Sequence, residues 1–363
     1  MKKITSYFLL LFTVALFGNN NNPCRLLTGK YTKEKKIHKT FDVNSSASLN
    51  IDNKYGDISI MTYSGSEIII DIIIKTNGND EEKVIDKLKQ INIEFKGNKD
   101  YVEAKTVFNT RNSYSWMSWF KSSSKVKMQI DYVVNLPITN HIDISNDYGG
   151  IYIEKLKGNA KISCDYGSIT SRELLSDQNE IRFDYSTGNF EYINEADVYA
   201  DYSSLIISKA NYIDLKADYS KTKINYIENF DFNCDFGAIN IDHVNTINGN
   251  GDYVSIRSKY IYQSGRFESD FGSLKIDELG KELKSLDIAS DYTGIVLGLN
   301  PDNTFNFDIN LSYASLKGKE LLNIKEENSK SNSKTYIGCF NSCNSSNLIS
   351  IKSDFGGVAF KKI

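Results

Sequence analysis

The sequence predicts an all-β protein, a parallel β-solenoid built from coils of 17–21 residues. A short unit containing an aromatic residue recurs along most of the chain, and apolar residues keep fixed offsets from that aromatic. The composition, with 3 prolines, 23 glycines and 23 tyrosines in 363 residues, is typical of strands joined by tight turns. The formal net charge of −3 gives no global field that would favour nucleic acid or an anionic membrane.

The first 18 residues form a separate element. Lys2 and Lys3 precede the apolar run "YFLLLFTVALFG", which has the length of a secretory signal and is too short to span a bilayer. We therefore expect residues 1–18 to be a signal peptide, residues 19–36 to be a linker, and the mature chain to lie in the periplasm or at the cell surface. Cys24 leaves lipid anchoring open, although Pro23 and several asparagines precede it in place of small apolar residues. No later segment has the pattern of a transmembrane helix.

Residues 37–140 predict a cap of strands with one helix. "EIIIDIIIK", "YVEAKTVF" and "KVKMQIDYVVNLP" have the composition of strands, and "NIDNKYGDISI" is one isolated copy of the repeat unit. The helix is predicted over residues 79–91, where Asn79 or Asp80 is a candidate N-cap and acidic residues fill the first turn. We expect this region to cover the open end of the solenoid, whose first coil would otherwise expose its pairing edge.

An aromatic tip, "RNSYSWMSWFKSSS", lies between two of these strands at residues 111–124 and contains both tryptophans of the chain. Such a tip could contact a glycan, a protein partner or a lipid surface. The simpler alternative is a hairpin tip that folds back onto the core of the cap. The candidate binding residues are Tyr114, Trp116, Trp119 and Phe120.

Residues 141–363 carry the repeat. From Tyr148 to Tyr313 the aromatic recurs at steps of 17–21 residues, and the last step, to Phe355, is 42 residues. The long step predicts that one coil has lost its motif inside an insertion at about residues 317–347. The aromatics are Tyr148, Tyr166, Tyr185, Tyr202, Tyr219, Phe236, Tyr253, Phe271, Tyr292, Tyr313 and Phe355.

The residues around each aromatic predict where its ring points. The fourth residue before it is apolar, the second before it is usually small, and the third after it is apolar. Because side chains alternate along a strand, the aromatic should share the inner face with the residues two and four before it. We therefore expect the rings to stack as an internal ladder, with the small residue leaving room for them and the following Gly or Ser permitting the bend. A unit this small cannot bury its own apolar face, so neighbouring coils must stack.

An aspartate precedes the aromatic in most units and points outward on the same argument. Its simple role is to accept backbone N–H bonds across the corner, as in Asx-turns. The alternative is a column of carboxylates that binds calcium, but the unit lacks the additional glycine-rich and acidic positions of calcium-binding β-rolls. We expect turn-capping, and no metal or other cofactor. The aspartates are Asp147, Asp165, Asp184, Asp201, Asp218, Asp235, Asp252, Asp270, Asp291 and Asp354.

The cysteines fall into two groups. Cys339 and Cys343 lie in a polar loop, where a local disulfide is plausible in an oxidising compartment. Cys164 and Cys234 occupy the same position of the repeat, two residues before the aromatic, and are expected to be buried free thiols. The spacings match no zinc motif.

No catalytic arrangement stands out in the sequence. The acidic residues are periodic, the connections between coils are short, and His38, His141 and His243 are widely separated. We therefore expect a protein that is not an enzyme. A polysaccharide-active β-helix enzyme and a purely structural envelope protein are the alternatives.

Taken together, these features resemble the bacterial putative-adhesin domains, adhesin-like β-solenoids akin to the head-GIN group of exported Bacteroidota proteins. The resemblance covers about residues 38–363 and depends on the order of "DEEKVIDKLKQINIEF", "IDYVVNLP", "IDISNDYGGIYIEKLKGNAKISCDYGSI" and "ISIKSDFGGVAF". It implies a right-handed, single-stranded β-solenoid outside the cytoplasm that binds a cell-envelope, glycan or protein ligand, and it offers no catalytic residues. The chain ends on a final coil without a sorting domain, so the periplasm is as open as the cell surface.

Overall fold

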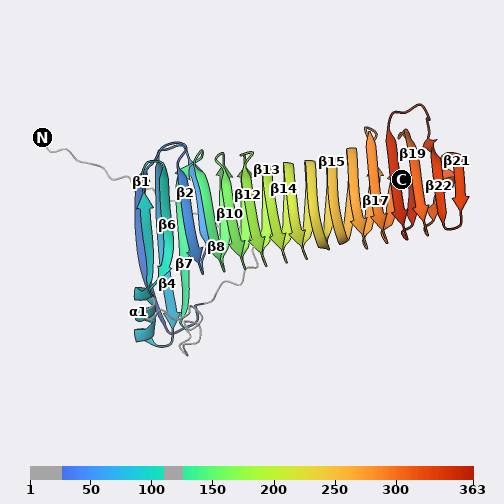
Figure 1. Ribbon diagram of the computed structural model, residues 1–363. Coiled ribbons are helices and arrows are strands. Elements are labelled where there is room, and N and C mark those ends of the chain that lie inside the picture. The colour runs from blue at the N-terminus through green and yellow to red at the C-terminus, as the bar shows by residue number, and fades with distance from the viewer. Residues whose placement is uncertain (1–26, 110–125) are drawn as a thin grey trace.

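The computed structural model describes residues 27–109 and 126–363 (Figure 1). These residues form an all-β structure with a single α-helix, and their strands join into one long sheet. Figure 1 shows the strands lying side by side along an elongated body that begins with β1 and α1 and ends with β21. In this part of the chain no helix has the length and apolar character needed to cross a bilayer.

The first part of the structure contains antiparallel strands that lead into a parallel stack. β1 pairs with β4 and β4 with β7 in antiparallel fashion, as β5 does with β6. β7 and β6 then pair in parallel with β3 and β2, which pair in parallel with β9 and β8. The strands are β1 (Tyr31–Asp42), β2 (Ser48–Lys54), β3 (Ile58–Tyr63), β4 (Glu67–Gly78), β5 (Ile91–Gly97), β6 (Tyr101–Phe108), β7 (Lys127–Pro137), β8 (His141–Asp147) and β9 (Gly150–Leu156).

Helix α1 spans Glu81–Gln90, inside the predicted range of 79–91. It begins after Asp80, whose side chain accepts a hydrogen bond from the backbone N–H of Lys83, as an N-cap residue does. Val84 is fully buried, and its carbonyl accepts a hydrogen bond from the Thr76 hydroxyl at the end of β4. The helix therefore packs against β1 and β4, beside the antiparallel end of the sheet (Figure 1).

The central repeats contribute strands of two kinds. One kind ends at the aspartate of the repeat, the other begins just after the aromatic, and each kind pairs in parallel with its own counterpart in the next repeat. The longer strands β13, β14 and β15 include both kinds, and β15 continues through the corners at Phe236 and Tyr253. The strands are β10 (Ala160–Asp165), β11 (Ser168–Leu174), β12 (Asn179–Asp184), β13 (Thr187–Asp201), β14 (Ser204–Asp218), β15 (Lys221–Asp270), β16 (Ser273–Leu279), β17 (Ser285–Asp291) and β18 (Gly294–Leu299).

The register places equal positions of neighbouring repeats side by side. Asp165 pairs with Asp147 on one side and with Asp184 on the other, and Asp184 pairs with Asp201. The inward-facing residues of all repeats consequently form one continuous apolar core that extends from the antiparallel end to the last strands. This in-register stacking is what aligns every outward-facing position into a row.

The C-terminal strands do not follow one another in chain order. β23 lies between β17 and β19 and is parallel to both, and β24 lies between β18 and β20. Residues 319–340 form η1 and a hairpin of β21 and β22, and β22 pairs antiparallel with β19. The elements are β19 (Phe305–Ser312), β20 (Leu316–Lys317), η1 (Lys319–Leu321), β21 (Asn323–Lys330), β22 (Ser333–Phe340), β23 (Leu348–Asp354) and β24 (Val358–Lys362).

This order corrects one expectation. The 42-residue step from Tyr313 to Phe355 does not conceal a coil that has lost its motif within residues 317–347. Those residues close the end of the sheet with a hairpin, and the chain then returns to insert its last repeat one step back along the stack. The sequence spacing alone could not distinguish a degenerate coil from a hairpin, because both lengthen the step.

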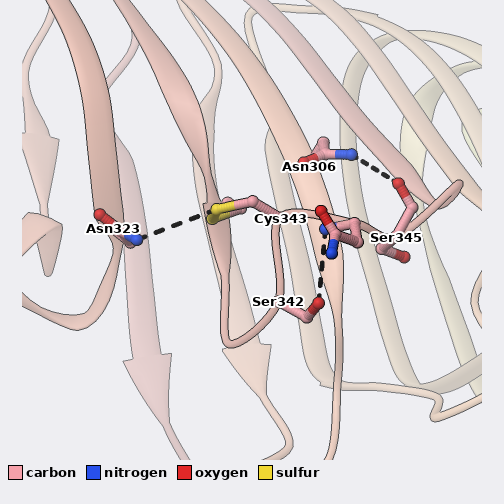
Figure 2. Close-up of a disulfide and its surroundings, with 7 residues drawn as sticks. Asn306, Asn323, Ser342, Cys343 and Ser345 are labelled. Carbon is pink, nitrogen blue, oxygen red and sulfur yellow. Dashed lines mark hydrogen bonds between the residues drawn. A yellow bond between two sulfur atoms is a disulfide. The ribbon is translucent and has the colours of Figure 1, made fainter.

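A disulfide joins Cys339 and Cys343 directly before this return (Figure 2). Cys164 and Cys234 are buried free thiols, and burial raises the pKa of each to about 12. Both thiols are therefore protonated and unreactive at neutral pH.

Candidate functional site

The repeated aromatics lie on the outside of the stack. The aromatic ladder, Tyr148 to Phe355 as given above, has side chains between 42% and 61% exposed, so the expected internal ladder is wrong. One further ring joins it: Tyr55, in the isolated copy of the unit, is nearly buried and stacks on Tyr148.

The reason is a left-handed backbone at the aromatic itself. Each ladder residue has φ between 50° and 60°, a region that bulky side chains rarely adopt. This turn breaks the inward–outward alternation, so that the ring points to solvent and the next residue points inward. In one repeat, Val198 and Ala200 are buried, Asp201 and Tyr202 are exposed, and Ser203 is buried again.

We expected the Gly or Ser after the aromatic to permit the bend, but the left-handed backbone belongs to the aromatic. The residue after it lies on the inside of the corner. Where it is glycine, as at Gly167, a Cβ atom would overlap the backbone carbonyl of Gly149 in the neighbouring repeat. Where it is serine, the buried hydroxyl is bonded. Ser203 Oγ donates to the carbonyl of Phe183 and accepts from the backbone N–H of Ser186.

The exposed rings stack face to face along the whole body. From Tyr148 onward, neighbouring ring centroids are 4.7–5.2 Å apart and ring planes differ by 1–9°. Ring faces are thus covered by their neighbours, and ring edges and tyrosine hydroxyls face solvent. The result is a continuous, amphipathic stripe on the surface.

An aspartate row runs beside the ladder, formed by the residues that precede the aromatics. Asp201 Oδ1 accepts a hydrogen bond from the backbone N–H of Asp218 at 3.0 Å, and Asp270 Oδ1 accepts one from Asp291 at 2.9 Å. The acceptor role is as expected, but the donor belongs to the next repeat and not to the same corner. The carboxylates therefore connect neighbouring repeats, which corrects the Asx-turn assignment.

The aspartate row carries uncompensated negative charge. Asp147 is paired with Lys54, whose Nζ lies 2.7 Å from its carboxylate, and the other nine aspartates have no ion pair with any described residue. Partial burial and the neighbouring carboxylates raise the pKa of Asp165 and of Asp252 above the usual 3.8. Burial is the larger cause of both shifts, and the charge of the neighbouring carboxylates adds to it.

A hollow of about 250 Å³ opens beside the row. Asp252, Asp270 and Asp291 line it from three successive repeats, together with Glu268 and Lys352. The surface next to the ladder is thus indented as well as acidic at this point.

A contribution to stability does not by itself explain why the ladder positions are aromatic. A non-glycine residue in the left-handed region costs on the order of 1–3 kcal/mol. A stacked aromatic pair contributes roughly 0.5–1.5 kcal/mol beyond its buried area, so the two effects about cancel. Glycine or asparagine would adopt this backbone at lower cost, and the sequence nevertheless repeats Tyr or Phe.

The other residues singled out from the sequence do not gather into a site. The aromatic tip with Tyr114, Trp116, Trp119 and Phe120 lies outside the described residues, as do Cys24 and the segment predicted to be a signal peptide. In the described ranges, no group of three or more His, Cys, Asp or Glu side chains has an arrangement that could hold a metal ion. The histidines bond separately: His38 to Asp71, His141 to the backbone N–H of Asn159, and His243 to Tyr262.

Comparison with known proteins finds solved structures that are similar to this chain at low identity. No family model matches it, and no curated protein matches it. It is similar to the solved structure of a putative cell adhesion protein from Clostridium sporogenes, with 10% identity and a TM-score of 0.20 over 91% of this chain and 100% of that one. It is also similar to putative adhesins from Parabacteroides merdae (9% identity, TM-score 0.40) and Bacteroides fragilis (11%, 0.34); both matches cover 72% of this chain and 96% and 97% of those.

The names of these neighbours agree with the family resemblance of the sequence motifs. Identities of 9–11% and TM-scores of 0.20–0.40 carry no argument about a ligand or an activity.

Proposed function

We propose that the chain is an exported, adhesin-like protein that acts by binding and not by catalysis, and that the aromatic ladder with its aspartate row is the binding surface. The observation that carries the proposal is the row of half-exposed rings, each presented by a left-handed backbone. In the same proposal the chain winds as a right-handed β-solenoid with coils of 17–21 residues, capped by residues 37–140.

Three features support a binding role for the ladder. Long contiguous stripes of exposed apolar atoms are uncommon on monomeric soluble proteins and often mark interaction sites. Tyrosine is enriched at interfaces because its ring supplies contact area while its hydroxyl supplies a hydrogen bond. Residues held in unfavourable backbone regions also tend to occur at functional sites.

The shape of the surface favours an extended ligand. Ten steps of 4.7–5.2 Å give the ladder a length of about 50 Å, far longer than a small-molecule pocket. A polymer of the cell envelope, a glycan or an extended protein segment could contact many rings at once, and the aspartate row favours a partner that brings positive charge. Many weak contacts along one ligand add up by multivalency.

The test replaces three consecutive rings in the purified mature chain. In Tyr185/Tyr202/Tyr219→Asn, asparagine tolerates the left-handed backbone, so we expect the fold to persist and retention on bacterial cells or on a glycan array to fall at least about tenfold. Tyr152→Asn, an exposed tyrosine outside the ladder, is the matched control and should bind like the parent.

Other outcomes would replace the proposal. Loss of retention only in Trp116/Trp119→Ala would make the aromatic tip the site. Failure of the parent chain to bind any cell, glycan or envelope fraction would favour the purely structural alternative. Release of reducing ends from a polysaccharide by the parent chain would favour an enzyme.

A further inference from the structure

The last repeat of the chain occupies a slot inside the stack. The terminal repeat, β23 and β24 (residues 348–362), lies between the strands of the preceding two repeats, so that Ile351 pairs with Ile288 on one side and with Ile309 on the other. Phe355 accordingly stacks between Tyr292 and Tyr313, at 4.7 and 4.8 Å. A chain terminus is thus enclosed by strands that precede it in sequence.

The terminal repeat supplies the strand pairing between two parts of the structure, with β17 and β18 on one side of it and β19 and β20 on the other. We call residues 305–340, which contain β19 to β22, the end unit. Among the described strands, β19 and β20 pair with β22, β23 and β24 and have no pairing with β17 or β18. Without the terminal repeat, the end unit would be joined to the stack through residues 300–304, and strand edges would be open on both sides of the slot.

The slot fits this segment in detail. Ile349, Ile351, Val358 and Phe360 are buried in the common core. On one side the backbone N–H groups of Tyr292 and Ile295 donate to carbonyls of the segment. On the other side its own N–H groups at 355 and 358 donate to carbonyls of the end unit. Ser290 Oγ donates to Ser353 Oγ at 3.3 Å inside the corner.

A short polar tether connects the segment to the end unit. Residues 341–347 lead from Phe340, opposite Phe305 on one side of β19, to Leu348, opposite Asn306 on its other side. They are held by hydrogen bonds such as Asn306 Nδ2 to the carbonyl of Ser345, which Figure 2 shows beside the disulfide. The tether crosses two strand spacings, about 10 Å. Because the disulfide holds Cys343 to Cys339, the part that can extend runs from Cys343 to Leu348, and its five steps can reach about 17 Å.

These contacts depend on the sequence of the segment and not on the chain that supplies it. We propose that the slot is also an interaction surface for a second copy of this chain, whose residues 348–363 can fill it in place of the molecule's own. Two chains would then exchange terminal repeats and form a dimer with the pairing of the monomer, as in domain swapping. The short tether gives the cis segment an effective concentration in the millimolar range, so isolated molecules keep their own segment.

The proposal predicts that protein concentration during folding, before the slot is filled, determines which chain's terminal repeat enters it. A chain that folds at low concentration should insert its own terminal repeat, and a chain that folds at high concentration should partly receive the segment of a neighbour. Once inserted, a segment paired on both sides should exchange slowly.

A disulfide across the slot records which chain donated the segment. Ser290 and Ser353 pair in register, so Ser290→Cys/Ser353→Cys, in a Cys24→Ser background, should form an intrachain bond in the monomer and an interchain bond in the exchanged dimer. The full-length mature protein is refolded in a glutathione buffer at about 1 µM and at about 300 µM, concentrations below and approaching that effective concentration. The products are separated by non-reducing electrophoresis and assigned by mass spectrometry of the linked peptides.

The matched control places a cysteine at the same position of the uninterrupted stack. Ala217→Cys faces native Cys234 in register, and both sites are buried. This pair should give only intrachain bonds at both concentrations. If Ser290→Cys/Ser353→Cys melts far below the parent, Ser285→Cys/Leu348→Cys supplies the same readout at the exposed entrance of the slot.

The expected result is a severalfold rise, between the low and the high concentration, in the interchain disulfide that joins position 290 of one chain to position 353 of another. Intrachain bonds alone at both concentrations would overturn the proposal. So would dimers in sedimentation velocity that contain only intrachain bonds, because they would form through another surface.

Discussion

At the scale of the residue, the tyrosine at each corner combines an unfavourable backbone with favourable stacking. Tyr202 has φ of 52°, and its ring lies 5.0 Å from that of Tyr185 and 4.9 Å from that of Tyr219. The two contributions are separable because alanine keeps the backbone strain and loses the ring, whereas glycine loses both.

We therefore expect Tyr202→Ala to destabilise the protein more than Tyr202→Gly, by about 1 kcal/mol. Thermal or urea unfolding followed by circular dichroism measures the difference. Equal destabilisation by the two substitutions would mean that the left-handed backbone at this corner carries no strain.

The aspartates allow a prediction about pH. Partial burial and the carboxylates of Asp270 and Asp235 raise the pKa of Asp252, while the backbone N–H of Asp270 opposes this shift. A carboxyl group with a raised pKa in the folded state binds its proton more tightly there than in the unfolded chain. At a pH above the pKa of the folded state, the ionised carboxylate therefore lowers the free energy of unfolding. This penalty disappears as the pH falls below the pKa of the unfolded chain, about 3.8, because the group is then protonated in both states.

Asp252→Asn keeps an oxygen acceptor and removes the charge, so we expect its melting temperature to exceed that of the parent at pH 7 and the gain to vanish near about pH 3.5. Asp147→Asn is the control, because Asp147 is paired with Lys54 and its neutralisation should give no gain. An equal rise in melting temperature in both variants would mean that the rise comes from the lower net negative charge of the protein and not from repulsion between aspartates of the row.

At the scale of the element, the terminal repeat holds the end unit in place. Ile351 is almost completely buried between Ile288 and Ile309, and a polar residue there would leave an unsatisfied amide in the core. We expect Ile351→Asn to weaken insertion of β23 by about 3 kcal/mol.

Hydrogen exchange followed by mass spectrometry would locate the effect. In Ile351→Asn, residues 305–340 should lose protection together with residues 348–362, while residues 141–270 should exchange as in the parent. Retained protection over 305–340 would show that the end unit holds to the stack without the terminal repeat.

At the scale of the whole molecule, the sequence predicts the stacking better than it predicts the surface. The recurring apolar positions before and after the aromatic require neighbouring repeats to cover one another, and the paired strands bear out this all-β architecture. The odd spacing between the apolar positions before and after each aromatic predicts a break in alternation, but the sequence does not show which residue makes it, and assigning it to the Gly or Ser after the aromatic turns the ring inward. In the structure Ala200 and Ser203 are buried and Tyr202 is exposed, so the break in alternation lies at the aromatic itself, whose backbone leaves the β conformation.

The C-terminal order was beyond sequence reasoning for a different reason. The final repeat, "ISIKSDFGGVAF", has the same pattern as the others, and any neighbour with an open edge could accept it. Its place between β17 and β19 depends on the length of the crossing from Leu299 to Phe305 and on the hairpin that closes the end. These are properties of the assembled stack.

The reactivity of a cysteine at the corner tests most directly whether each repeated aromatic is turned out of the core. Two cysteine variants of the purified chain, Tyr202→Cys and Ala200→Cys, each in a Cys24→Ser background, are reacted with a thiol reagent under native conditions, where native Cys164 and Cys234 are buried. We predict fast labelling at position 202 and protection at position 200 until the protein unfolds, because the first side chain is half-exposed and the second is buried. Protection at position 202, or equal labelling of both positions, would show that the aromatic is not turned out of the core.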